Sequence, residues 1–240
     1  MAATTITTEV SHASLGSYQL MQLLQLTSPA LPIGGFSWSQ GLEFAIDAGW
    51  LRHEEDTLQW LRGLIRHSLA NLDIPILLRL QRAAVLEDAE ERLEQLGTWN
   101  RFILASRETA ELQLEDLQMG AALRRLLLDL GFYSEAHFPS GDLSYLTAFA
   151  MAAAEKRVDQ QAACTGFMWS WVENQIAAAL KAFPLGQTAG QRIFHGMVDD
   201  VLAALQHGMN LPDEMIGNSM PGQIMASMLH EEQYSRLFRS

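Results

Sequence analysis

Residues 28–43 read SPALPIGGFSWSQGLE, and they mark the place where a stiff loop passes into a helical chain. Two prolines restrict the backbone, whereas the Gly34-Gly35 pair leaves it free to turn. Ser37 and Gln40 have the spacing of a capping box, which marks the start of a helix. Apolar residues at helical spacing follow as far as Gly49. The segment therefore predicts a loop of the kind found at active sites, followed directly by a capped helix.

Helical spacing of apolar residues continues along the rest of the chain. Strand-like alternation and the Asn-Gly and Asp-Gly hairpin signals are absent from the sequence. The connections are short, which gives no sign of a domain boundary. The sequence therefore predicts an all-α fold, a single compact domain of about nine or ten helices over residues 18–230. After a first helix that ends near Pro29 and a second from Ser37 to Gly49, we expect helices at about 54–72, 73–87, 89–106, 108–130, 143–156, 158–183, 188–207 and 222–230.

The two ends of the chain differ from this helical body. Residues 1–17 are rich in Thr and Ser, and we expect a disordered leader there, without the features of a signal peptide. Residues 231–240 instead combine aromatic, apolar and arginine side chains, which are the types enriched at protein–protein interfaces. Composition alone leaves two roles open for this tail, docking on a partner or packing on its own body. The tail residues concerned are Tyr234, Arg236, Leu237, Phe238 and Arg239.

Charge and cysteine content narrow the class of protein. The formal net charge is −12, from 28 acidic and 16 basic residues, which argues against nucleic acid as a partner. The longest mostly apolar run has about twelve residues, whereas a membrane-spanning helix needs about 20. Cys164 is the single cysteine, so no internal disulfide can form, which suits a reducing compartment. We therefore expect a cytoplasmic protein that contacts neither nucleic acid nor membrane.

The sequence does not match the known motifs for catalysis and metal binding that we compared with it. The phosphate-binding pattern G-x-x-x-x-G-K-[ST] is absent, and Gly35-Phe36-Ser37-Trp38-Ser39 lacks the last glycine of a nucleophile elbow. None of the seven histidines lies four residues from another, and Cys164 has no C-x-x-C partner. We expect no catalytic residue, no metal site and no stably bound cofactor. Two alternatives stay open, a small-molecule enzyme that uses Ser37 and a generic helical scaffold.

Four blocks of sequence, in order along the chain, carry a resemblance to a known family. They span residues 28–43, residues 105–112 with 118–120, residues 173–191 and residues 227–240. Each block is ordinary alone, but the four together resemble the UreF family of urease accessory proteins.

The resemblance implies an all-α homodimer that is not an enzyme. It implies three partners, a UreD/UreH-type accessory protein, the GTPase UreG and apo-urease, with nickel handled by the complex. We further hypothesise that the tail orders on binding the UreD-type partner through the tail residues named above. A second hypothesis places Gly34, Gly35 and Phe36 with Arg107 and Glu108 on a surface that faces the GTPase or a second copy of the chain. Its alternative is that the glycines only shape a turn and that Arg107 and Glu108 pair locally.

Overall fold

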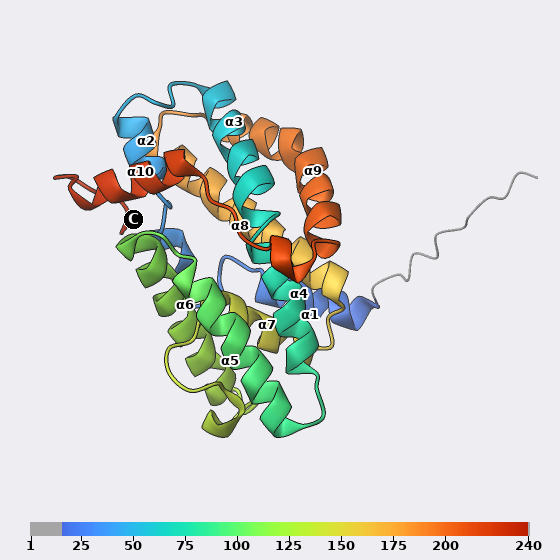
Figure 1. Ribbon diagram of the computed structural model, residues 1–240. Coiled ribbons are helices and arrows are strands. Elements are labelled where there is room, and N and C mark those ends of the chain that lie inside the picture. Colours follow the sequence, from blue (N-terminus) through green and yellow to red (C-terminus); the bar gives the residue numbers. More distant parts are fainter. Residues whose placement is uncertain (1–15, 240) are drawn as a thin grey trace, which may run out of the picture.

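The computed structural model describes residues 16–239, and every regular element in that range is helical (Figure 1). The predicted all-α class and the single compact chain are therefore confirmed. Three short 3₁₀ turns, at 35–37, 135–137 and 213–215, and a π-helical turn at 65–69 complete the elements. The helices are α1 Ser17–Leu26, α2 Leu42–Asp47, α3 Glu54–Leu64, α4 Asp73–Ala84, α5 Ala89–Ala105, α6 Ala110–Asp129, α7 Tyr145–Glu155, α8 Gln160–Ala182, α9 Gln187–Met209 and α10 Pro221–Glu231.

The predicted leader lies mostly outside the described residues, which begin at Gly16. Ser17, its last residue, is the first residue of α1. The helix predicted at 54–72 consists of α3 and the π-helical turn that follows it. The other long helices lie within a few residues of their predicted limits, because their apolar faces recur at the helical period.

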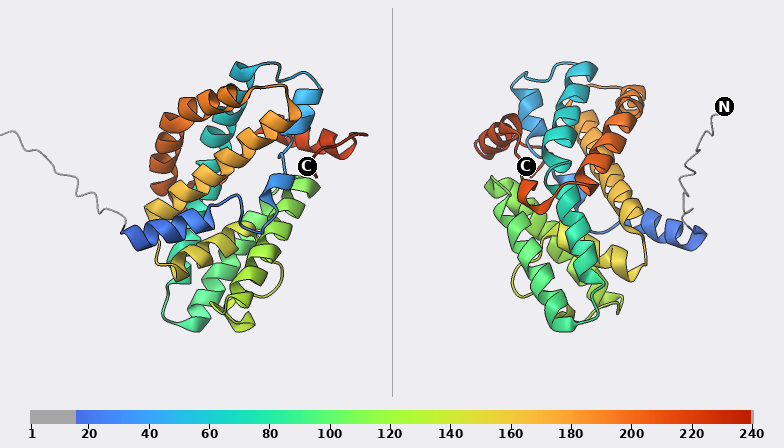
Figure 2. Two further views of the ribbon diagram at one scale, coloured as in Figure 1. Left: turned by 180° about the vertical axis from the view of Figure 1, so that it is seen from behind. Right: turned by 45° about the vertical axis from the view of Figure 1, so that its right-hand side comes forward.

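Helices α4 and α7 form the centre of the molecule. All eight residues from Leu146 to Ala153 of α7 are buried, and α7 packs against α4, α5 and α6. On the other side, α3, α8 and α9 pack together, and α4 contacts α8 and α9 as well (Figure 1). Figure 2 shows α1 running across the back of the molecule, where it contacts α7 and α8. The two helix groups thus share one core.

The predicted capping box at Ser37 and Gln40 is wrong. Ser37 ends a 3₁₀ turn, and α2 begins only at Leu42, with Gly41 as its N-cap residue at φ +82°. A Cβ on Gly41 would lie 2.8 Å from the backbone nitrogen of Ser227 in α10, so another helix occupies the space beside this cap. The side chain of Gln40 is drawn instead toward α6 and α8, where it accepts and donates hydrogen bonds.

Two other helices begin differently from what cap-forming residue types in the sequence indicate. Thr188 and Gln191 have the spacing of a capping box, but α9 already begins at Gln187 after Gly186. Asp73 does not cap α4 from outside but occupies its first turn, where its carboxylate pairs with Arg107. In each case the helix itself was predicted, and the chemistry of its first residues was not.

The crossing of α6 and the start of α7 depends on a glycine. A Cβ on Gly120 would lie 2.0 Å from the carbonyl oxygen of Leu143 and 2.7 Å from the carbonyl carbon of Ser144. Both obstacles are backbone atoms, which cannot turn aside as a side chain can. Asn100 holds the same turn in place, donating to the carbonyl of Asp142 and accepting from the amide of Ser144.

We therefore predict that Gly120→Ala lowers the free energy of unfolding by about 1–3 kcal/mol, the usual cost of overpacking. Urea unfolding followed by circular dichroism measures this change. Gly196→Ala in α9 is the matched control, since its Cβ would meet Leu58 at an ordinary 3.5 Å. The control should change stability little, or raise it by up to about 1 kcal/mol through helix propensity. Equal midpoints for Gly120→Ala and the unaltered chain would contradict the close approach.

Candidate functional site

A cavity of about 260 Å³ opens between the 28–40 loop, the start of α6 and the middle of α8. We call it the loop cavity. Three of the four sequence blocks meet there, because its lining includes Gly35 and Phe36, Arg107 and Glu108, and Glu173. The structure thus brings together most of the loop residues that the sequence singled out.

The individual loop residues have different environments. Gly34 has φ +77°, which favours glycine, and its missing Cβ faces open space. A Cβ on Gly35 would lie 3.3 Å from the methyl group of Met119, a tight contact in the cavity wall. Phe36 is 72% exposed although it lines the cavity, so its ring stands at the opening. The turn therefore presents an aromatic side chain to whatever approaches.

Arg107 joins three helices beneath the loop cavity. Its Nη2 lies 2.7 Å from Asp73 at the start of α4, and its Nε lies 2.8 Å from Asp116 in α6. Asp116 also accepts a 2.6 Å hydrogen bond from the amide of Tyr145, the first residue of α7. Burial acts to lower the pKa of Arg107, but the attraction of the two aspartates is larger than this effect, so the pKa is raised. Arg107 therefore pairs with these aspartates rather than with the exposed Glu108 beside it.

Glu115 is a buried carboxyl group in the same cavity. Its Oε1 accepts a 2.9 Å hydrogen bond from Gln40, whose own Oε1 accepts from the indole of Trp171 at 3.0 Å. Its Oε2 is buried and has no hydrogen-bond partner. Burial raises the pKa of Glu115 to about 8, although Gln40 and Arg107 act in the opposite direction. Burial likewise raises the pKa of Glu173. Perturbed carboxyl groups in one cavity are typical of a functional site.

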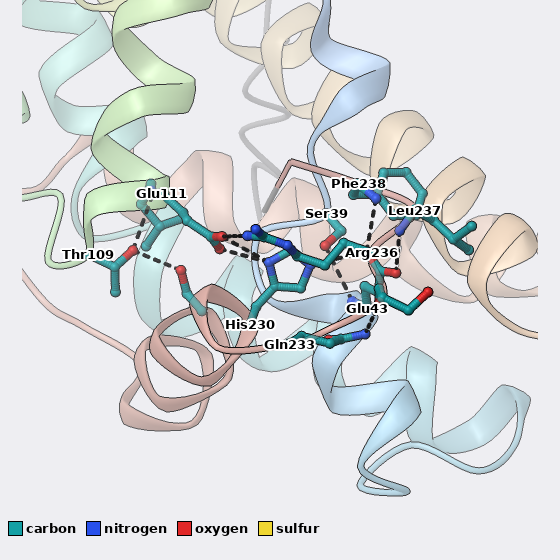
Figure 3. A network of polar contacts seen from close by, with 12 residues as sticks. Ser39, Glu43, Thr109, Glu111, His230, Gln233, Arg236, Leu237 and Phe238 are labelled. Atoms are coloured by element: carbon teal, nitrogen blue, oxygen red, sulfur yellow. Dashed lines mark hydrogen bonds and ion pairs between the residues drawn. The ribbon is translucent and has the colours of Figure 1, made fainter.

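A second arrangement lies where α2, α6 and α10 meet (Figure 3). His230 is fully buried between two carboxylates, with Nδ1 3.0 Å from both oxygens of Glu111 and Nε2 3.1 Å from Glu43. We call these three residues the tail clamp. Since both ring nitrogens face acceptors, His230 satisfies both only as a doubly protonated imidazolium. Burial opposes this charge, but the bonds to Glu111 and Glu43 outweigh it and raise the pKa of His230.

The tail clamp holds the C-terminal residues against the body. Glu43 accepts the backbone amides of Leu237 at 2.7 Å and Phe238 at 3.0 Å, and Arg236 reaches Glu111 at 3.3 Å. Phe238 is buried, with the Lys181 ammonium 4.5 Å from its ring centre. The amide of Arg239 donates to the carbonyl of Ser37 in the 28–43 loop. These contacts fix the path of the tail on the chain's own body, which differs from the expectation that the tail orders on binding a partner.

The side chains of the tail divide into two sets. Arg236, Phe238 and Arg239 contact the body, Arg239 through a 2.8 Å bond to Gln118. Tyr234 is fully exposed, and Leu237 is 58% exposed. Packing on the body, one of the two roles left open by composition, is therefore shown for three residues, whereas Tyr234 and Leu237 are exposed to solvent.

Within residues 16–239, no three His, Cys, Asp or Glu side chains are grouped so that they could hold a metal ion. Nor does that range contain a helix with the length and apolar character required to cross a bilayer.

Comparison with known proteins identifies the family. A family model described as UreF matches residues 51–198. This chain belongs to the UreF family. It is 46% identical over 222 residues to a protein of Teredinibacter turnerae, covering 92% of this chain and 99% of the relative. It is 42% identical over 225 residues to a protein of Marinobacter nauticus, and the alignment covers 94% of this chain and 96% of that relative. Both relatives are named "Urease accessory protein UreF".

Membership of the UreF family confirms the resemblance predicted from the four sequence blocks. A UreF-family chain is an accessory protein of urease maturation and not itself an enzyme. The alternative of a small-molecule enzyme built on Ser37 is therefore wrong, as is that of a generic scaffold.

Sequence reasoning did not find the tail clamp of this UreF-family chain. His230 precedes two glutamates but lacks the second histidine of an H-E-x-x-H metal motif, and Glu43 simply ends the 28–43 segment. The one signal in the sequence is an ionisable residue on the apolar face of the last helix. Its two acidic partners lie 119 and 187 residues away along the chain, so no local spacing points to them.

We predict that the packing of the tail against Glu43 depends on pH through His230. Its pKa is raised above the ordinary 6.5, so the stabilisation is complete below about pH 6.5 and is lost as pH rises through the raised value. Glu43 and Glu111 are the charged groups that contact the ring, and Arg236 pairs with Glu111. The amide resonances of Leu237 and Phe238, followed by NMR from pH 6 upward, should therefore leave their hydrogen-bonded positions.

The control for this titration is His53→Gln, which removes an exposed histidine paired with Asp56 elsewhere. It should leave the transition of the two amides unchanged, whereas His230→Gln should abolish it. A transition that persists in His230→Gln would assign the pH dependence to another group.

Proposed function

We propose that this chain is an adaptor in urease maturation, which joins a UreD/UreH-type accessory protein and a UreG-type GTPase on apo-urease and supports GTP-dependent delivery of nickel. It acts as a cytoplasmic homodimer, and nickel is handled by the complex rather than held by this chain. The sequence offers no phosphate-binding loop, so nucleotide belongs to the GTPase partner. The observation that carries the proposal is the tail, whose backbone is fixed while Tyr234 and Leu237 face solvent.

The tail is proposed as the surface for the UreD/UreH-type partner. Exposed aromatic and aliphatic side chains on a fixed backbone bind with a small loss of conformational entropy. Met225 and Met228 are exposed on α10, directly before the tail, and extend the apolar surface. Methionine side chains adapt well to a partner's shape. Arg236, Phe238 and Arg239 contribute by holding the tail in its course.

The opening of the loop cavity is proposed as the surface for the GTPase. Phe36 and Glu108 are both exposed there, one aromatic and one charged. Gly34 and Gly35 shape the turn that carries Phe36, and Arg107 fixes the floor below Glu108 through its two aspartates. The homodimer would use a different face. Its proposed contact is α1, where Tyr18, Met21 and Leu24 are exposed although apolar.

The maturation role predicts a loss of urease activity when the chain is removed. A urease-producing cell without this chain, grown with nickel, should make urease protein at a normal level but with activity lowered at least tenfold. Activity per urease protein and bound nickel measure the effect. Re-supplying the full chain should restore both. Fully active urease without the chain would refute the accessory role.

Removal of residues 231–240 should abolish co-purification with the UreD/UreH-type partner while helicity is retained. The deletion also removes Phe238 from its seat, so a gentler variant separates binding from folding. Tyr234→Ala with Leu237→Ala leaves the backbone bonds to Glu43 in place and should weaken co-purification at least tenfold. Val85→Ala is the matched control, since Val85 is an exposed aliphatic residue at the end of α4. Unchanged pull-down by the double variant would show that the tail is not the docking surface.

A further inference from the structure

The loop cavity is rich in carboxyl groups and poor in cations. Five acidic residues line it, and among the described lining residues Arg107 is the single basic one. Arg107 is already engaged with Asp73 and Asp116. No described cation in the lining therefore remains to balance the other three carboxyl groups, Glu108, Glu115 and Glu173.

Among these three carboxyl groups, Glu115 is the one whose surroundings most clearly lack a cation. Only 7% of its surface is exposed, and its Oε2 has no hydrogen-bond partner, although its Oε1 is bound by Gln40. A buried acceptor without a donor is destabilising, and a buried charge without a counterion is more so. Burial favours the neutral form of Glu115, and a cation placed beside it would favour the ionised form. The site is thus complementary to a positively charged ligand.

The other walls of the cavity indicate which kind of cation fits. Aromatic side chains of Phe36, Tyr145, Phe167 and Trp171 take part in the lining, together with aliphatic ones. A planar guanidinium stacks on aromatic rings, and the methylene stem of its side chain packs on apolar surface. A metal ion would instead need several ligands around one point, and residues 16–239 provide no such group. A compact ammonium is more strongly hydrated and gains less from these rings.

We propose that the loop cavity binds the guanidinium group of an arginine side chain from a protein partner, with Glu115 as its principal anion. That the arginine comes from a protein partner rests on the proposed adaptor function. That the site suits a guanidinium group does not depend on that function. On binding, neutral Glu115 releases its proton to solvent, and the resulting carboxylate pairs with the guanidinium. Glu173 and Glu108, in the same lining, add to the attraction.

The test uses ethylguanidinium chloride as the probe and the whole chain as the protein. The indole NMR signal of Trp171, identified by its loss in Trp171→Phe, reports occupancy, because this indole bonds the Gln40 that holds Glu115. We expect a saturable shift in the millimolar range, at least fivefold weaker binding of ethylammonium, and no response to sodium chloride of equal ionic strength. Circular dichroism at the highest probe concentration checks that the chain stays folded.

Proton linkage provides a second readout. Because binding requires ionised Glu115, the affinity should rise by up to about tenfold per pH unit between pH 6 and pH 8. Calorimetry at pH 7 in buffers of different ionisation enthalpy should detect the released proton. A structural role of Glu115 alone would give neither effect.

Glu115→Gln keeps the oxygen that Gln40 bonds but cannot ionise, so it should bind ethylguanidinium at least tenfold more weakly and without proton release. Glu90→Gln, on the exposed first turn of α5 and outside the cavity, is the matched control and should bind normally. If Glu115→Gln does not fold, Glu173→Gln takes its place, with a severalfold loss expected. Normal binding by the variant that folds would overturn the proposal.

Other outcomes would also contradict the proposed guanidinium site, or would show that the site exists while the proposed adaptor function is wrong. Equal affinity for ethylammonium would remove the guanidinium specificity. If Ni²⁺ alone shifts or broadens the Trp171 signal saturably, and Glu115→Gln abolishes that effect while ethylguanidinium has none, the cavity is a metal site instead. If ethylguanidinium binds as expected but urease matures without this chain, the site stands and the proposed function fails.

Discussion

The ion pairs of Arg107 with Asp73 and Asp116 are the constraint on which the centre of the fold depends. Arg107 lies in the connection between α5 and α6, Asp73 begins α4, and Asp116 of α6 accepts from the first amide of α7. Loss of one partner would leave a buried charge unpaired, which is strongly destabilising, so the starts of α4 and α7 are held in register with α6. Gly120 of α6 comes close to Leu143 and Ser144 directly before the start of α7, so the same register sets this close contact.

Most of the fold could be predicted from the sequence because helices are local. The faces of α5 to α9 repeat with the helical period, and their limits follow from it. The cap at Ser37 failed for a physical reason, since the fully buried Trp38 and the passage of α10 beside Gly41 delay the start of α2. These are contacts between distant segments. Spacing within one segment cannot reveal them.

The candidate site could be predicted only in part, because some of its contacts join segments that are distant in the sequence. The loop, Arg107 and Glu108 were singled out by composition and by family resemblance, and the structure brings them to one cavity. Glu115 and the tail clamp were missed, since a glutamate in an acidic helix looks like a solvated residue until its burial is known. The 28–43 loop segment links both arrangements, because Gln40 binds Glu115 in the cavity and Glu43 binds the tail.

Glu43 holds the tail by two main-chain amides, and this choice of donors has a consequence for substitutions in the tail. Every residue except proline supplies such an amide, so these two bonds do not depend on which side chains stand at positions 237 and 238. The exposed residues Tyr234 and Leu237 can therefore be exchanged without loss of these bonds, whereas Arg236 and Phe238 add side-chain contacts of their own. Replacement of Glu43, by contrast, removes the acceptor of both amides at once.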